Sequence, residues 1–113
     1  MRRAAPMRRR ARKAQTRAER AHLALVASKP CLICGAWPVH VHHLRHDPAT
    51  GAPLGMSQRA PHAHTIPLCP RHHQDGPKGV AFHAGPQTFE ATHGREVDLW
   101  RRFMNTLKEA KHA

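Results

Sequence analysis

The sequence predicts a small α+β domain, and three observations lead to this fold class. Cys31-x-x-Cys34 and Cys69-x-x-His72 have the spacings of paired ligands in structural zinc sites. Two short runs with strand-like alternation lie at residues 37–42 and 64–68. Residues 96–111 have helical periodicity. At 113 residues, the chain has the length of one domain with tails.

Composition explains why the domain needs a metal ion. The chain is 40% hydrophobic but has only three Phe, two Trp and no Tyr. Residues 38–88 are rich in Pro, Gly and His, so they bury too little apolar surface to offset the entropy lost on ordering. Metal ligation is the usual remedy, and we expect the zinc-free chain to be poorly folded. The alternative is that the cysteines are only small buried residues, but the repeated spacing favours ligands.

A helix is predicted over residues 11–27, which are rich in the helix formers Ala, Arg, Gln and Glu. Ser28-Lys29-Pro30 ends this helix, because the residue before a proline leaves the α region. The first cysteine pair follows in a tight turn, in which Gly35 supplies a backbone conformation that other residues resist.

A strand, a loop, a second strand and a helix are expected next. Residues 37–42 alternate apolar and polar side chains, and residues 45–63 lack any periodicity. His64–Leu68 forms the second strand. Pro70 opens a short helix that Gly76-Pro77 ends. This order is a ββα unit whose helix opens with the second ligand pair.

Two more helices are expected after this unit. Residues 88–93 form the first, with Gly94 as its C-cap. The second spans Glu96–Lys111, where Trp100 and Phe103 lie in an apolar stripe and are interpreted as core residues. The predicted fold is therefore a ββα core with flanking N- and C-terminal helices.

The net charge of +12 is concentrated near the N-terminus. Residues 1–29 carry ten Lys or Arg against one acidic residue, whereas residues 30–113 carry nine against six. We interpret residues 1–20 as a disordered basic arm that binds DNA and residues 21–113 as the zinc-stabilised domain. The alternative is a solvated tail without a dedicated partner. The basic side chains expected to contact DNA are Arg2, Arg3, Arg8, Arg9, Arg10, Arg12 and Lys13.

The sequence also bears on the compartment. No segment approaches the roughly 18 apolar residues of a membrane span, and the N-terminus has no apolar signal region. An odd number of cysteines at metal spacing favours a reducing compartment over a disulfide scaffold. We expect a cytoplasmic protein, although the Arg-rich, acid-poor start also resembles a mitochondrial transit peptide.

Several histidines are left over beside the predicted zinc ligands. His43 follows His42 at the end of the first strand, His64 opens the second strand, and His73 follows the ligand His72. Neutral imidazole binds divalent metals and accepts protons near neutral pH. Neighbouring residues on a strand point to opposite faces, so His42 and His43 must do different jobs. Phosphodiester hydrolysis needs both a general base and a stabilising cation.

These residues resemble a known family. His42-His43, Ile66-Pro67-Leu68-Cys69 and His72-His73 are similar to the HNH, or ββα-metal, endonuclease motif. Within that group, residues 22–105 most resemble the Ref-type, RecA-dependent recombination-enhancement nucleases of phages and prophages. The matching segments read KPCLICG, HH, GMSQRAPH, IPLCPRHH and GVAFHAGPQTFEATHG. The resemblance implies DNA cleavage with Mg²⁺ or Mn²⁺, a recombinase filament as a partner, and the cytoplasm of a bacterial or phage-infected host cell.

The resemblance also implies a role for each histidine. His43 is the general base, and His42 and His73 hold the catalytic metal. His64 stands where many relatives have the asparagine that orients the base, and His62 competes for that position. His83 looks like a further histidine seen in some relatives, which makes it the third ligand of the catalytic metal.

The sequence thus favours a metal-dependent HNH endonuclease that hydrolyses DNA phosphodiester bonds, for example in phage recombination. One alternative is a zinc knuckle that binds nucleic acid without catalysis. Another is a regulatory protein whose zinc fold docks onto a protein filament. The first alternative needs only the four zinc ligands, so it leaves the extra histidines His43 and His73 without a purpose.

Overall fold

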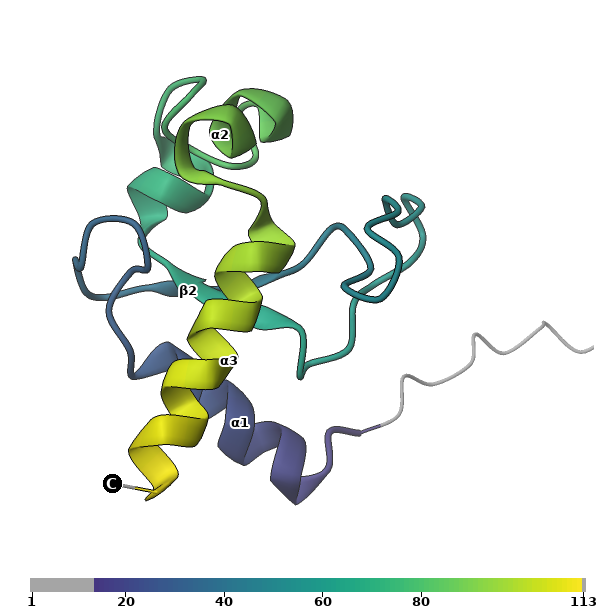
Figure 1. The fold of residues 1–113 in the computed structure, drawn as a ribbon, viewed down its shortest axis with the longest axis vertical. Coiled ribbons are helices and arrows are strands. Elements are labelled where there is room, and N and C mark those ends of the chain that lie inside the picture. The colour runs from purple at the N-terminus through teal and green to yellow at the C-terminus, as the bar shows by residue number, and fades with distance from the viewer. Residues whose placement is uncertain (1–13, 113) are drawn as a thin grey trace, which may run out of the picture.

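The computed structural model describes residues 14–112 as a small α+β domain with one two-stranded antiparallel sheet. This confirms the predicted fold class. In Figure 1, α3 crosses the sheet beside β2, α1 lies below the sheet, and η1 and α2 lie above it. The elements in chain order are α1 (Arg17–Ala27), β1 (His40–His43), β2 (Thr65–Leu68), η1 (Arg71–Asp75), α2 (Pro86–His93) and α3 (Glu96–His112).

α1 begins at Arg17, six residues later than predicted. The hydroxyl of Thr16 accepts a hydrogen bond from Glu19 N at 3.0 Å, and the Glu19 carboxylate accepts one from Thr16 N at 2.9 Å. This capping box satisfies two backbone donors that the first turn leaves unpaired. The helix therefore includes residues 17–20, which the sequence analysis assigned to the basic arm. It ends at Ala27, as Ser28-Lys29-Pro30 predicts.

The two strands are shorter than predicted, but their pairing places the histidines. β1 begins at His40 rather than at residue 37, and β2 begins at Thr65, so His64 lies just outside the sheet. His42 pairs with Ile66 and His43 with Thr65. Every residue of β2 is buried. Because both strands are sheet edges, Pro67 is tolerated without a backbone donor.

The helix of the ββα unit is short, as predicted, but it is a π-helical turn rather than an α-helix. η1 has five residues and closes with a hydrogen bond from Gly76 N to Arg71 O at 3.0 Å. A Cβ at Gly76 would collide with that carbonyl oxygen, so only glycine fits there. His72 and His73 are two of the five residues of this turn, so its wide geometry sets their positions.

α1 and α3 complete the core against the sheet, with side chains from the cysteine-bearing turns between them. α3 spans 17 residues, and α2 begins two residues before the predicted start. The buried core consists of Val26, Cys31, Leu44, Ala60, Ile66, Leu68, Cys69, Phe82, Phe89, Val97, Leu99 and Phe103. Within residues 14–112, no helix has the length and hydropathy needed to cross a bilayer.

Candidate functional site

The four predicted zinc ligands gather at one point, with their ligand atoms within 4.8 Å of one another. Cys34 Sγ lies 3.7 Å from Cys69 Sγ. His72 Nδ1 lies 3.3 Å from Cys69 Sγ and 3.9 Å from Cys31 Sγ. A tetrahedral zinc ion with bonds of about 2.3 Å to sulfur and 2.05 Å to nitrogen spaces two sulfurs about 3.8 Å apart and sulfur from nitrogen about 3.6 Å. The group therefore fits structural zinc.

The backbone of the first cysteine turn prepares Cys31 for this role. Gly35 N donates to Cys31 O at 2.9 Å, and Gly35 adopts a φ of 75°, which favours glycine. Ile33 N points at Cys31 Sγ at 3.4 Å. Burial raises the pKa of the Cys31 thiol, but backbone N–H groups, with Cys69 first among them, outweigh burial and lower it overall. These groups stabilise the thiolate that a metal requires.

A second group forms from His42, His73 and His83, whose ligand atoms also lie within 4.8 Å of one another. His73 Nε2 is 3.1 Å from His83 Nε2. The centroid of the His42 ring lies 5.2 Å from that of His73 and 5.3 Å from that of His83. Three imidazole rings whose nitrogen atoms converge in this way are a suitable donor set for a divalent first-row metal. The sequence prediction grouped the same three residues.

The two groups are joined through the backbone of η1. Phe82 N donates to His72 O at 2.9 Å, and the next amide, His83 N, donates to His73 O at 3.0 Å. These bonds place the loop that carries His83 alongside the turn that carries His72 and His73. The first group therefore fixes the backbone on which the second is built.

Two histidines of the second group, His73 and His83, are kept neutral by their surroundings. Burial lowers the pKa of His73 to about 3, and the neighbouring rings of His42, His83 and His40 add to this effect. Burial likewise lowers the pKa of His83, and His42 lowers it further. Both rings are therefore uncharged at neutral pH and have a nitrogen lone pair to offer a metal.

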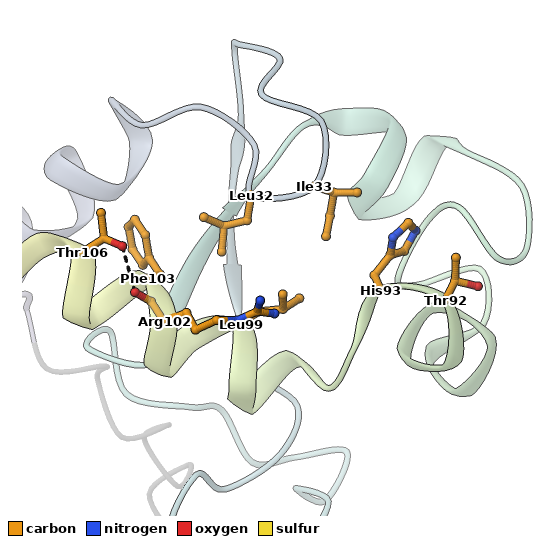
Figure 2. A pocket seen from close by; sticks show the side chains of 8 residues that line it. All are labelled: Leu32, Ile33, Thr92, His93, Leu99, Arg102, Phe103 and Thr106. Carbon is orange, nitrogen blue, oxygen red and sulfur yellow. Dashed lines mark hydrogen bonds between the residues drawn. The ribbon is translucent and has the colours of Figure 1, made fainter.

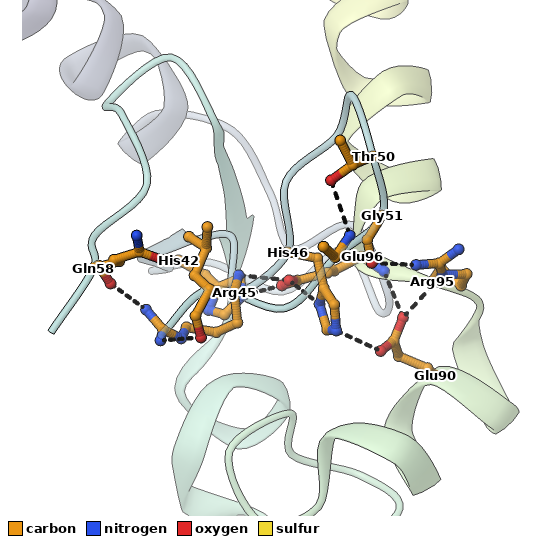
Figure 3. Close-up of polar contacts among 11 residues, drawn as sticks. His42, Arg45, His46, Thr50, Gly51, Gln58, Glu90, Arg95 and Glu96 are labelled. Carbon is orange, nitrogen blue, oxygen red and sulfur yellow. Dashed lines mark hydrogen bonds and ion pairs between the residues drawn. The ribbon is translucent and has the colours of Figure 1, made fainter. Parts of the chain in front are cut away.

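A buried carboxylate, Glu96, which the sequence analysis missed, contacts His42 of this group (Figure 3). Glu96 accepts hydrogen bonds from His42 Nε2 at 2.7 Å, from His46 Nδ1 at 2.8 Å and from Arg45 N. Burial raises the pKa of Glu96, but the hydrogen bonds, with that of His42 first, outweigh burial and lower it overall. In the sequence, Glu96 looks like an ordinary first-turn glutamate that favours the helix dipole.

His40, to which the sequence analysis gave no role, also contacts the second group. Its Nδ1 lies 2.9 Å from Nδ1 of His73. Metal-binding histidines usually have such a partner on the second ring nitrogen, because it fixes the tautomer and the orientation of the ring. The alternation of β1 gave the signal, since His40 and His42 lie two residues apart and share a strand face.

His43 has different neighbours from His42, as opposite strand faces require. Its Nε2 lies 2.9 Å from Nδ1 of His62. Burial lowers the pKa of His43 to about 4, and the charges of Arg59 and His62 also contribute. His43 is thus a neutral imidazole at neutral pH, which is the form a general base requires.

His64 does not occupy the position beside His43 that the sequence analysis gave it. Its ring packs edge-on against Trp100, with centroids 4.9 Å apart. The contact with His43 comes from His62, the competing residue. The reason is that β2 begins only at Thr65, and the Thr65 hydroxyl donates to His62 O at 2.8 Å, which folds the preceding loop back toward β1.

The remaining predicted contacts, the basic side chains of residues 2–13, lie outside the described residues. One cavity, of about 430 Å³, lies between the first cysteine turn and α3 (Figure 2). Leu32 and Ile33 line it from the turn, and Leu99 and Phe103 line it from α3. None of the candidate metal ligands lines this cavity, so we do not assign it to the site.

Comparison with known proteins identifies the family but no activity. No curated protein and no solved structure matches the chain. The model of a family described as "Protein of unknown function (DUF968)" matches residues 4–109, which is nearly the whole chain. The protein therefore belongs to the DUF968 family, and it carries a candidate Cys₃His metal site with a histidine cluster beside it.

Proposed function

We propose that this protein is a metal-dependent endonuclease of the HNH type that hydrolyses phosphodiester bonds in DNA. The observation that carries the proposal is that a closed Cys₃His group lies beside a separate three-histidine group. The adjoining η1 residues His72 and His73 belong to the first and the second group, respectively. A structural zinc site uses all four of its ligands, whereas a catalytic site keeps positions open for substrate. The second group has three ligands and one exposed member, His83.

His43 supplies the second requirement of the reaction. In an in-line hydrolysis, the attacking water and the leaving oxygen lie on opposite sides of the phosphorus atom. His43 is the last residue of β1 and directly follows His42, so a phosphate at the end of this strand would lie near both the base and the metal group. His43 would accept the proton of the water, and His62 would hold the His43 ring in position.

The donor set also bears on which cation fits. A divalent cation held by His42, His73 and His83 would stabilise the negative charge that develops on the phosphate and the leaving oxygen. Imidazole nitrogen suits Mn²⁺ and the later first-row metals, whereas Mg²⁺ prefers oxygen ligands. Of the two cations that the HNH resemblance implies, Mn²⁺ fits these side chains better.

Plasmid nicking tests the proposal. Zinc-loaded protein is incubated with supercoiled and with single-stranded DNA, with Mg²⁺, Mn²⁺, Co²⁺ or no added metal, and with or without a recombinase filament. We expect nicking that depends on added metal and is strongest with Mn²⁺ or Co²⁺. His43→Ala should abolish nicking and leave zinc content and DNA binding intact.

A matched variant separates catalysis from a merely structural role. His93 is a histidine on α2 whose ring packs against His72 of the zinc group, but His93 belongs to neither metal group. His93→Ala should therefore nick like the unmodified protein. Equal nicking by His43→Ala and the unmodified protein would refute the role of His43 as the base. No metal-dependent nicking by the unmodified protein would favour a zinc knuckle that only binds nucleic acid.

A further inference from the structure

A cavity of about 650 Å³ opens beside the histidine group. His83 lines it, so the cavity adjoins the candidate catalytic metal. Lys78, Arg45 and His46 line it as well, together with the amide side chain of Gln87. Its volume lies within the range of roughly 300–1,000 Å³ typical of small-ligand sites. The cavity is therefore large enough for a charged group of the substrate.

The balance of charge in this cavity is positive. Glu90 is the one acidic residue that lines it. The Glu90 carboxylate already accepts from Glu96 N at 3.2 Å and lies 3.9 Å from Arg95 Nε and 4.0 Å from His46 Nε2. It is thus occupied with holding the start of α3, as Figure 3 shows, and among the described residues it forms no ion pair with Arg45 or Lys78.

The two cations Arg45 and Lys78 differ in how they are held. The Arg45 guanidinium donates to the carbonyl oxygens of Gln58 at 2.9 Å and Gly55 at 3.0 Å, so its charge is fixed against the loop. Lys78 is exposed and has no ion pair within residues 14–112. A compact, strongly hydrated ammonium group of this kind is a common phosphate contact.

Gly85 keeps Lys78 close to the cavity. A Cβ at Gly85 would lie 3.0 Å from Cγ of Lys78 and 3.4 Å from its Cε. The aliphatic stem of Lys78 therefore lies directly over the Gly85 backbone, and a methyl group at Gly85 would shift this stem by a few tenths of an ångström. Gly85 has a φ of 179°, which is extended backbone that alanine also adopts. Substitution at Gly85 thus moves Lys78 without straining the chain.

We propose that this cavity binds a backbone phosphate of DNA, the neighbour of the phosphate that lies at the histidine group. Lys78 is the main contact, and the fixed charge of Arg45 adds to the attraction. The identity of the ligand rests on the proposed function. Phosphate contacts position a strand without reading its sequence, so this subsite sets the register of the cut and not the choice of site.

The test measures DNA binding and not cleavage. Lys78→Ala and Lys108→Ala are each made in the His43→Ala background, and fluorescence anisotropy with a DNA duplex is recorded over a salt series. Lys108 is the control because it is an exposed lysine on α3 that does not line this cavity. Loss of one phosphate contact should lower the slope of log K against log salt by about 0.9 for Lys78→Ala and leave it unchanged for Lys108→Ala.

Two further arms make the outcome specific. Gly85→Ala keeps the charge of Lys78 but displaces its stem, so it should weaken binding less than Lys78→Ala does. Inorganic phosphate should compete with DNA less effectively in Lys78→Ala than in the Lys108→Ala control. Equal slopes for the two lysine variants would overturn the subsite even if His43→Ala abolishes nicking. A lowered slope for Lys78→Ala, together with no metal-dependent nicking by the unmodified protein, would keep the subsite and refute the nuclease.

Discussion

Glu96 Oε2 lies 2.7 Å from His42 Nε2, and both side chains are buried, at 0% and 1% exposure. The two residues come from α3 and β1 and are 54 positions apart in the chain. An ionised carboxylate only accepts hydrogen bonds, so His42 must carry its proton on Nε2. A neutral His42 then has its free lone pair on Nδ1, and this is the atom that it can offer to a metal.

Replacing this carboxylate should weaken the second metal group without removing the first. Glu96→Gln has a single acceptor oxygen, so it cannot serve His42 and also accept from both His46 and Arg45 N on the other side. We expect Mn²⁺ to bind zinc-loaded Glu96→Gln about 10- to 100-fold more weakly, as measured by isothermal titration calorimetry. Glu109→Gln, an exposed change on the same helix, is the control. Equal Mn²⁺ affinities in the two variants would show that Glu96 does not position His42.

Loss of a zinc ligand should unfold the domain. His72→Ala leaves three ligands, and the small core has few aromatic side chains to compensate for the lost metal. Since structural zinc contributes on the order of 10 kcal/mol to folding in small domains, we expect loss of zinc and of cooperative thermal unfolding. The measurements are metal analysis of the purified protein and circular dichroism. His93→Ala, whose ring packs against His72 without joining the group, should retain one zinc ion and fold normally. A folded, zinc-free His72→Ala protein would contradict the structural role.

The candidate Cys₃His group could be predicted from the sequence because the spacing within each of its two pairs is local. Cys31 and Cys34 share one tight turn, and Cys69 and His72 share another, so the two-residue spacing fixes the geometry within each pair. Glu96 could not be found in this way. Its contact with His42 depends on how α3 packs on the sheet, and a first-turn glutamate gives no local sign of such a contact.

The start of α1 and the neighbour of His43 show two other limits. Composition alone extended the helix back to residue 11, whereas the capping box of Thr16 and Glu19 sets its start. That motif is local, so the sequence itself contains this boundary. The choice between His62 and His64 is different, because the path of the loop before Thr65 decides it, and loops without periodicity leave no such pattern.

The contact between His62 and His43 predicts which loop histidine matters for cleavage. His62→Ala removes the ring that lies 2.9 Å from His43 Nε2, so we expect the turnover rate for plasmid nicking to fall about 10- to 100-fold. DNA affinity measured by anisotropy should not change. His64→Ala removes a ring contact with Trp100 instead and should lower the melting temperature while nicking stays within about threefold. The reverse pattern, with nicking lost in His64→Ala alone, would restore the role that the HNH resemblance gives to His64.

Deleting residues 1–13 should weaken DNA binding and flatten its dependence on salt. This segment holds seven Lys or Arg residues, and each phosphate contact that is lost lowers the slope of log K against log salt by about 0.9. The deletion keeps Thr16 and Glu19, so the capping box and α1 remain intact and zinc content should not change. A longer deletion of residues 1–20 would also remove the first turn of α1, and its loss of DNA binding would then mix charge with folding. The salt slope of the shorter deletion is therefore the informative measurement, and an unaltered slope would mean that the DNA contacts lie on the folded domain.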